Sequence, residues 1–295
     1  MTNDVVIGGK QYQIQGGMVR ILSLRQEYLD DVSRPEATIQ EIRERKLPAD
    51  LFTFWQRPPE TSPRFPYSME WDNLAVLEIS TYEKWLMEEI HPNARNKIRR
   101  AERLGLVVRV EPFTDKLVAG LAEVFNETPV RRGKRYLYYG WDLERVKRTW
   151  ATQLDQSVWV VAYYREEVVG FIKLIVGDRL ARTSGTLAKE AHRDKSPMNA
   201  VFAKCVEVCA SRGVPRLVYG KYVYGQGEDS LTAFKKTIGF KKVDLPRYYI
   251  PLTMRGRIGL RLRLHHGLNE VIPGPALHVL LRTRSKLYEV WKQWT

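Results

Sequence analysis

The sequence is short of the residues and patterns that build disulfides, metal centres and membrane spans. Only two cysteines occur among its 295 residues, Cys205 and Cys209. Their spacing of four on an expected helix puts them on one buried face and unpaired, which favours a reducing compartment. The five histidines are scattered, so we expect no metal site. No apolar run reaches the roughly 18 residues that a membrane-spanning helix needs.

The N-terminus lacks the basic-then-apolar layout of a signal peptide, which together with the reduced cysteines predicts a cytoplasmic protein. What the chain has in excess is positive charge, a net +14 at pH 7. Lys and Arg outnumber Asp and Glu most strongly in residues 91–104, 131–148 and 253–295. Clustered cations predict an anionic partner such as phosphate, nucleic acid or an acidic membrane, although solvated basic surfaces give the same pattern.

Hydrophobic periodicity and turn residues predict a mixed α/β fold. In the first hundred residues, Gly16 and Gly17 predict a hairpin turn, and Ser33 with Glu36 predicts the capped start of a helix over 35–46. The remaining expected elements there are strands at 51–55 and 74–79 and helices at 81–90, starting after Ser80, and 93–104. Beyond them we expect strands at 106–110, 157–164, 168–175, 179–184, 214–219 and 240–250 and helices at 114–126, 141–154, 197–211 and 229–238.

The most informative motif is the stretch Ser230-Leu-Thr-Ala-Phe-Lys-Lys-Thr-Ile-Gly-Phe240. It predicts a helix that stops at Gly239, because glycine adopts the left-handed conformation without a Cβ penalty, followed at once by a strand. The motif resembles the last helix and following strand of the GNAT acyltransferase superfamily, and the Phe234-Lys235 pair resembles its FemAB-type branch. The element order over 105–252 is also that of a GNAT domain, a mixed sheet with helices on both faces.

The resemblance implies three regions and one chemistry. Residues 1–104 would be a partial GNAT-like α/β region, 105–252 the acyltransferase domain, and 253–295 a basic amphipathic tail. The reaction would be attack by an acceptor amine or hydroxyl on an activated acyl carbonyl. Lys235 stands where many GNAT domains place a general-acid Tyr, so it would stabilise the oxyanion or donate a proton. An exposed helix lysine has the same sequence pattern.

Further site residues follow from the resemblance. No general base is obvious: Glu127, at the end of the first core helix, is the candidate, Asp178 and Asp229 are other carboxylates near strand ends, and an exposed acid at a helix end is the more common meaning of the Glu127 pattern. Strand amides are expected to stabilise the oxyanion at three positions, namely Thr186, Leu187 and Ala188.

The acyl donor is less clearly specified. GNAT domains bind its pyrophosphate at a helix N-terminus through the pattern Gln/Arg-x-x-Gly-x-Gly/Ala. Here residues 189–199 contain no glycine, so the backbone cannot wrap a pyrophosphate as closely. The expected donor contacts are Arg193, Lys195, Ser196 and Asn199. The donor would be an acyl-coenzyme A or, as in several FemAB-type proteins, an aminoacyl-tRNA.

Basic residues interleaved with tyrosines in 130–140 predict recognition of a phosphate together with a sugar or base. An ordinary surface loop with packed tyrosines is the alternative. The expected acceptor is a phosphorylated or envelope-linked sugar or peptide. Its predicted binding residues are Arg131, Arg132, Arg135, Tyr138, Tyr139, Tyr222 and Tyr224.

The last forty residues fall outside the transferase pattern. Residues 258–264 fit a strand and a helix equally well. Residues 276–295 predict a basic amphipathic helix with terminal tryptophans, which suits the headgroup region of an anionic membrane and would place the protein peripherally at the inner membrane face. Docking of this face on the N-terminal region is the competing interpretation.

Two other functions compete with acyl transfer to an envelope precursor. The first is a nucleic-acid-directed acyltransferase that modifies tRNA or DNA, which the positive charge favours. The second is a non-catalytic binding module that kept the fold and lost the donor chemistry, which the missing glycines allow.

Overall fold

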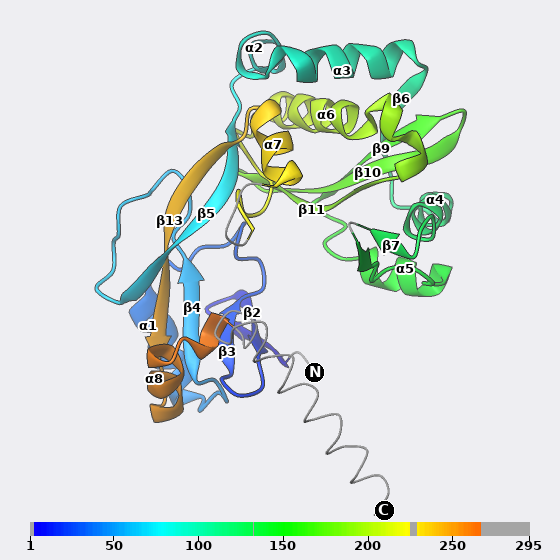
Figure 1. The fold of residues 1–295 in the computed structure, drawn as a ribbon. Coiled ribbons are helices and arrows are strands. Elements are labelled where there is room, and N and C mark those ends of the chain that lie inside the picture. Colours follow the sequence, from blue (N-terminus) through cyan, green and yellow to red (C-terminus); the bar gives the residue numbers. More distant parts are fainter. Residues whose placement is uncertain (1–2, 132, 225–228, 267–295) are drawn as a thin grey trace, which may run out of the picture. The chain divides into compact units, whose positions relative to one another are not determined.

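The computed structural model describes residues 3–131, 133–224 and 229–266, and these residues form two compact units (Figure 1). Unit 1 comprises Met1–Trp71 and Leu245–Thr295, and unit 2 comprises Asp72–Asp244. Two strands, β5 (Ser68–Glu78) and β13 (Lys241–Pro251), each begin in one unit and end in the other.

Unit 1 is built on strands in the order β1-β2-β3-β4-β13, in which only β3 and β4 run parallel. The other elements are β1 (Asn3–Ile7), β2 (Lys10–Gln15), β3 (Ile21–Leu24), β4 (Leu51–Trp55), α1 (Pro35–Glu44), α8 (Met254–Arg261) and the short 3-10 helix η3 (Leu264–His266). The core includes Leu22, Phe52, Phe54 and Tyr248, all of which are fully buried.

Unit 2 contains strands in the order β5-β12-β11-β10-β9-β6 and a separate small hairpin of β7 and β8. Its strands are β6 (Leu106–Glu111), β7 (Val130–Arg131), β8 (Lys134–Arg135), β9 (Ser157–Tyr164), β10 (Glu167–Val176), β11 (Ala181–Ala188) and β12 (Arg216–Val218). Its helices are α2 (Tyr82–Lys84), the π-helix η1 (Trp85–Glu89), α3 (Pro92–Arg103), α4 (Asp115–Phe125), α5 (Leu143–Trp150), the 3-10 helix η2 (Glu190–Lys195), α6 (Pro197–Ser211) and α7 (Ser230–Thr237).

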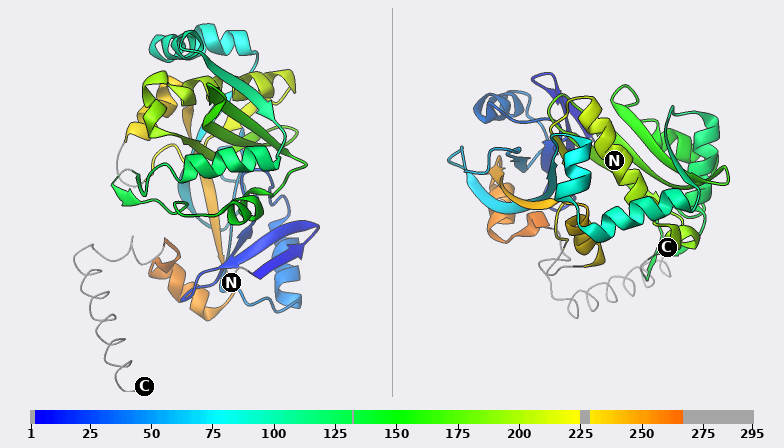
Figure 2. Two further views of the ribbon diagram at one scale, coloured as in Figure 1. Left: turned by 90° about the vertical axis from the view of Figure 1, so that its right-hand side faces the viewer. Right: turned by 90° about the horizontal axis from the view of Figure 1, so that it is seen from above.

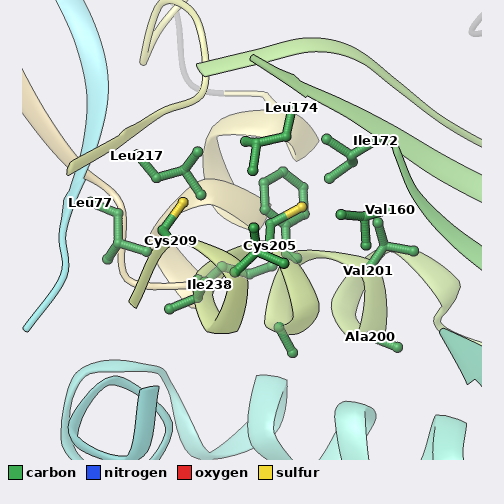
Figure 3. Close-up of a cluster of buried hydrophobic side chains, with 14 of the residues drawn as sticks. Leu77, Val160, Ile172, Leu174, Ala200, Val201, Cys205, Cys209, Leu217 and Ile238 are labelled. Carbon is green, nitrogen blue, oxygen red and sulfur yellow. The ribbon is translucent and has the colours of Figure 1, made fainter. Parts of the chain in front are cut away.

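The sheet of unit 2 is covered by helices on both faces, as predicted (Figure 1). Strand β9 makes this visible, because successive side chains of a strand point to opposite faces. Val158, Val160 and Ala162 join the core beneath α6, while the alternate residues Trp159, Val161 and Tyr163 pack with α4 and α5. Figure 3 shows the first of these cores, in which Cys205 and Cys209 of α6 lie among apolar side chains.

The hairpin predicted around Gly16 and Gly17 is confirmed, since β2 and β3 pair antiparallel across them. Three local details were wrong. Residues 16–20 form a longer connection instead of a two-residue turn, and the tight Gly-Gly turn is at Gly8 and Gly9, both with positive φ, between β1 and β2. Helix α1 has Arg34 at its N-cap without a side-chain cap, so Ser33 does not cap it. Thr81, not Ser80, caps α2, since its side chain accepts from the Lys84 amide.

The undecided stretch 258–264 is largely helical, within α8 and the start of η3. The predicted membrane-binding segment 276–295 and the predicted acceptor residue Arg132 lie outside the described residues. Within the described part of the chain, no helix is both long enough and apolar enough to span a bilayer.

Candidate active site

Two parallel strands of unit 2 separate soon after they meet. The pairing of β11 with β12 comprises only Ala181 with Leu217 and Arg182 with Val218. Strand β12 ends at Val218, whereas β11 continues to Ala188. The predicted oxyanion positions Thr186, Leu187 and Ala188 therefore lie on the part of β11 that has left β12, and on the other side they pair with β10. The Lys189 amide donates to the Val169 carbonyl of β10, so by strand alternation the Leu187 amide also faces β10, whereas the amides of Thr186 and Ala188 face away from it.

A bulge marks the point where β11 changes course. Lys173 of β10 pairs with Gly185, but the next residue, Leu174, pairs with Thr183, so Ser184 is the extra residue. Bulges bend a strand and are common beside active sites. At Gly185 an added Cβ would lie 2.3 Å from the Trp150 ring, so only glycine lets Trp150 of α5 approach the strand this closely.

Helix α7 carries Lys235, which lies on the β12 side of the gap between β11 and β12. Asp229 caps the helix by accepting from the Thr232 amide, and the Thr232 hydroxyl donates to the Tyr222 carbonyl at 3.2 Å. At the other end Gly239 has φ +94°, and the Phe240 amide donates to the Lys235 carbonyl, as predicted for a glycine-terminated helix. These contacts fix the helix on the segment that follows β12.

The Lys235 side chain is buried, with an exposed fraction of 1%. Its Nζ donates to the Lys221 carbonyl and lies 3.5 Å from the Tyr222 carbonyl. The same ammonium lies 5.1 Å from the ring centre of Tyr219 and 4.7 Å from that of Tyr224. An exposed surface lysine is thus excluded for Lys235 but describes its neighbour Lys236. A buried ammonium held by carbonyls and tyrosine faces is a preorganised positive charge.

Glu127 and Arg131 form a clamp at the end of β11. The Glu127 carboxylate accepts from the amides of Glu190 and Ala191 at 2.8 and 2.9 Å and pairs with Arg131 at 2.8 Å. The Arg131 guanidinium also donates to the Ala188 carbonyl at 2.9 Å. Both side chains are largely buried, so each is engaged in fixing the loop after β11. The base role predicted for Glu127 and the acceptor role predicted for Arg131 stay predictions.

The loop predicted to bind the donor phosphate is already hydrogen-bonded to itself. Ser196 has φ 56°, in the left-handed region, and its amide donates to the Arg193 carbonyl. Pro197 has no amide hydrogen, and the Asn199 amide donates to the Ser196 carbonyl. Lys195 pairs with Asp194 at 3.2 Å, whereas the Arg193 side chain is exposed.

The predicted acceptor residues fall into two groups. Tyr222 is buried and Tyr224 exposed, and both belong to the segment that surrounds Lys235. Tyr138 instead packs in the aromatic cluster on the α4 and α5 face, 5.2 Å from the Phe125 ring centre. Arg135, on strand β8, and Tyr139 are exposed.

Sequence reasoning missed Tyr219 and Lys173. Tyr219 directly follows β12, and its ring faces the Lys235 ammonium. Lys173 is buried in the middle of apolar β10, where its Nζ donates to the Trp150 carbonyl at 2.9 Å and to the Thr152 hydroxyl at 3.0 Å. Burial lowers the Lys173 pKa to about 8, with the Arg182 charge contributing. A lysine inside an otherwise apolar strand was the available signal.

Comparison with known proteins places this geometry in a family. Residues 91–236 match the family model described as acetyltransferase (GNAT) domain. No match was found among curated proteins. One similar structure is the C-terminal domain (DUF2156) of a putative lysylphosphatidylglycerol synthetase from Agrobacterium fabrum, with 16% identity, TM-score 0.60 and coverage of 89% of this chain and 86% of that one.

Two further structures share the fold. L-PGS from Bacillus licheniformis has 17% identity and a TM-score of 0.58, covering 89% of this chain and 88% of that chain. FemX has 10% identity and a TM-score of 0.59, covering 89% and 90%. At these identities the likeness to solved structures shows the fold alone. The family model covers the domain that contains the separated strands β11 and β12. Through residues 91–236 this chain belongs to the GNAT acyltransferase family.

Proposed function

We propose that this enzyme transfers an aminoacyl group from aminoacyl-tRNA to an amine or hydroxyl of a phosphorylated or envelope-linked acceptor. The acceptor attacks the carbonyl carbon of the aminoacyl ester, and the bond to the terminal ribose oxygen of the tRNA breaks. The proton lost by the acceptor ends on that ribose oxygen. Lys235 and strand amides within Thr186–Ala188 that face away from β10 stabilise the oxyanion formed between these two events.

The single observation that carries the choice of donor is the self-bonded loop before α6. In GNAT domains, backbone amides of this loop bind acyl-coenzyme A. Here the Ser196 and Asn199 amides already donate to carbonyls of the loop itself, those of Arg193 and Ser196. Pro197 has no amide hydrogen to offer, and the Lys195 ammonium beside the same turn is already paired with the Asp194 carboxylate. A pyrophosphate gains little there, whereas an RNA ester does not need that contact.

The charge of α3 supports an RNA donor. Its apolar face, with Ala94, Ile98 and Ala101, is buried beside α6. At 100° per residue, Arg99, Arg100 and Arg103 fall within about a quarter turn on the opposite, exposed face. None of these three forms an ion pair with another described residue. Since the apolar face is already buried, the helix has none left to insert into lipid, which favours a phosphate backbone as its partner.

Two exposed side chains of unit 2 suit a phosphorylated acceptor. Arg135 and Tyr139 are both exposed and supply a cation and an aromatic ring four residues apart. Such pairs suit a phosphorylated sugar or headgroup. One structural relative is named as a putative lysylphosphatidylglycerol synthetase, an activity that also joins an amino acid to a phosphorylated acceptor.

Isothermal titration of the full chain with two probes tests the donor. The probes are total tRNA charged with amino acids and acetyl-coenzyme A, with uncharged tRNA as the reference. We expect micromolar or tighter binding of charged tRNA and no heat from acetyl-coenzyme A. Binding of acetyl-coenzyme A alone would overturn the proposed donor, and binding of neither would favour the non-catalytic module.

A further inference from the structure

Three metal-binding side chains meet in unit 1, although the sequence separates them widely. Glu70 lies on β5, and His265 and His266 form the end of η3. One ligand atom from each of the three lies within 4.8 Å of the other two. The scattered histidines of the sequence gave no sign of this grouping.

Each carboxylate oxygen of Glu70 faces a different imidazole. Oε1 lies 3.1 Å from His265 Nε2, and Oε2 lies 2.9 Å from His266 Nε2. Ligands bound to zinc at 2.0–2.2 Å are about 3.3 Å apart in a tetrahedral arrangement. The three ligand atoms lie within 4.8 Å of one another, so rotations of the Glu70 and histidine side chains would bring them to this spacing around one cation.

The surrounding structure holds the histidines in position. The His265 side chain is 1% exposed, and the Tyr249 ring lies 4.5 Å from it, centre to centre. Besides its contact with Glu70, the buried His265 imidazole interacts with the backbone of Gly259. Arg263 has φ 56°, a left-handed conformation that is strained for arginine, and it turns the chain between α8 and η3. Strain of this kind is often kept at functional sites.

We propose that Glu70, His265 and His266 bind a divalent transition-metal ion of the zinc class. Two imidazoles and one carboxylate suit zinc and its neighbours, whereas calcium and magnesium prefer oxygen ligands alone. Glu70 and His266 are 36% and 30% exposed, so water can reach the ion and complete its coordination. The bound metal would fasten η3 to β5 within unit 1.

Metal binding is measured on the full chain after chelator treatment and dialysis. Zinc affinity is obtained by competition with a chromogenic chelator, and Co²⁺ absorption reports the geometry. We expect one zinc per chain and an absorption band of a four- or five-coordinate Co²⁺. His265→Ala, His266→Ala and Glu70→Gln should each weaken zinc binding at least tenfold, while the control His192→Ala, in unit 2, should bind like the wild type.

A second measurement covers the case in which a variant folds poorly. In the wild type, electron paramagnetic resonance of bound Cu²⁺ should show hyperfine coupling to two imidazole nitrogens, and in His266→Ala to one. The proposal is overturned if the wild type does not compete for zinc, or if zinc binding survives in all three variants. The first result would mean that Glu70 only hydrogen-bonds to His265 and His266 without binding a metal. The second would mean that the metal binds elsewhere in the chain.

Discussion

At the scale of single residues, Lys235 is the side chain on which the proposed chemistry depends most. Replacing it with alanine removes the buried ammonium, and loss of one oxyanion-stabilising group typically lowers turnover by about 10²–10³-fold. The measurement is the rate at which charged tRNA transfers its amino acid to hydroxylamine, a surrogate acceptor. Lys236→Ala, which changes an exposed lysine of the same helix, should retain nearly full activity. Equal rates in a folded Lys235→Ala protein would contradict the assignment.

Lys173 should make the free energy of unfolding depend on pH in the alkaline range. Its pKa is about 8 in the folded protein against an ordinary 10.5, so the unfolded chain binds more protons between these values. Stability from this group is therefore fully present above pH 10.5 and is lost as pH falls towards 8. Urea unfolding at several pH values should show wild type gaining on Lys173→Met across that window, by up to about 1.4 kcal/mol per pH unit.

For Lys173, a Lys236→Met protein is the matched control, because it removes an exposed lysine. Its difference from wild type should be flat over the same pH range. A flat difference for Lys173→Met as well would mean that the buried ammonium keeps its ordinary pKa.

Sequence identified Lys235 through a family pattern, but it did not predict the contacts that make the position buried. Those contacts come from the Lys221 and Tyr222 carbonyls, which belong to a different element. Lys173 was missed for the same reason, since its partners Trp150 and Thr152 lie at the end of α5 and just beyond it. Residue types reveal which chemistry a side chain can do, whereas its surroundings depend on long-range packing.

At the scale of elements, α3 carries the prediction on RNA binding. Figure 2 shows this helix alongside α6 in unit 2. Arg99, Arg100 and Arg103 changed together to alanine should flatten the dependence of log affinity for tRNA on log salt by about 2 to 3, at 0.7–0.9 per lost phosphate contact. Filter binding of labelled tRNA at a series of salt concentrations measures the slope.

The matched control for α3 removes the same charge from unit 1, as Arg34, Arg43 and Lys46 to alanine, all of them exposed. Its salt dependence should equal that of the wild type. If the wild type binds tRNA and both triple variants have its slope, the α3 surface is not the contact, although the proposed donor still stands. If the wild type does not bind tRNA, the donor proposal itself is wrong.

Most elements were predictable because their periodicity and caps are local. Helix α6 begins at Pro197 and α7 ends before Gly239, as the sequence indicated. The errors arose where two local signals were equivalent. Gly8-Gly9 and Gly16-Gly17 are alike in sequence, and only the pairing of β1 with β2 selects the first as the tight turn. Similarly, Ser80 and Thr81 are both good caps, and helix phase selects Thr81.

At the scale of the whole molecule, the two cysteines should report unfolding. Cys205 and Cys209 are fully buried, and burial raises the pKa of the Cys205 thiol well above its ordinary value and that of Cys209 to about 12. A thiol reagent such as DTNB should therefore label neither in the native protein and both in denaturant. A Ser184→Cys protein, with its thiol on the exposed bulge of β11, should label within seconds as a positive control. Rapid native labelling of the two natural thiols would contradict the burial of α6.

No local pattern in the sequence indicates that unit 1 is formed from both ends of the chain. The composition of the units depends on β5 and β13, which each pass from one unit to the other. Local propensity makes both of them strands, but it does not specify their partners. Such pairings are decided by the free energy of the whole chain, which is why element order was predictable and unit membership was not.

The alternation of β9 has a consequence for the tolerance of this strand to mutation. An antiparallel strand with one wet face accepts polar residues at every second position, but β9 supplies side chains to two separate cores. A one-residue slip would exchange the two sets and drive Trp159 into the space that Val158 or Val160 fills beneath α6. Both cores therefore fix the pairing register of β9. In a library that randomises this strand, we expect polar substitutions at every position from Val158 to Tyr163 to reduce the fraction of folded members.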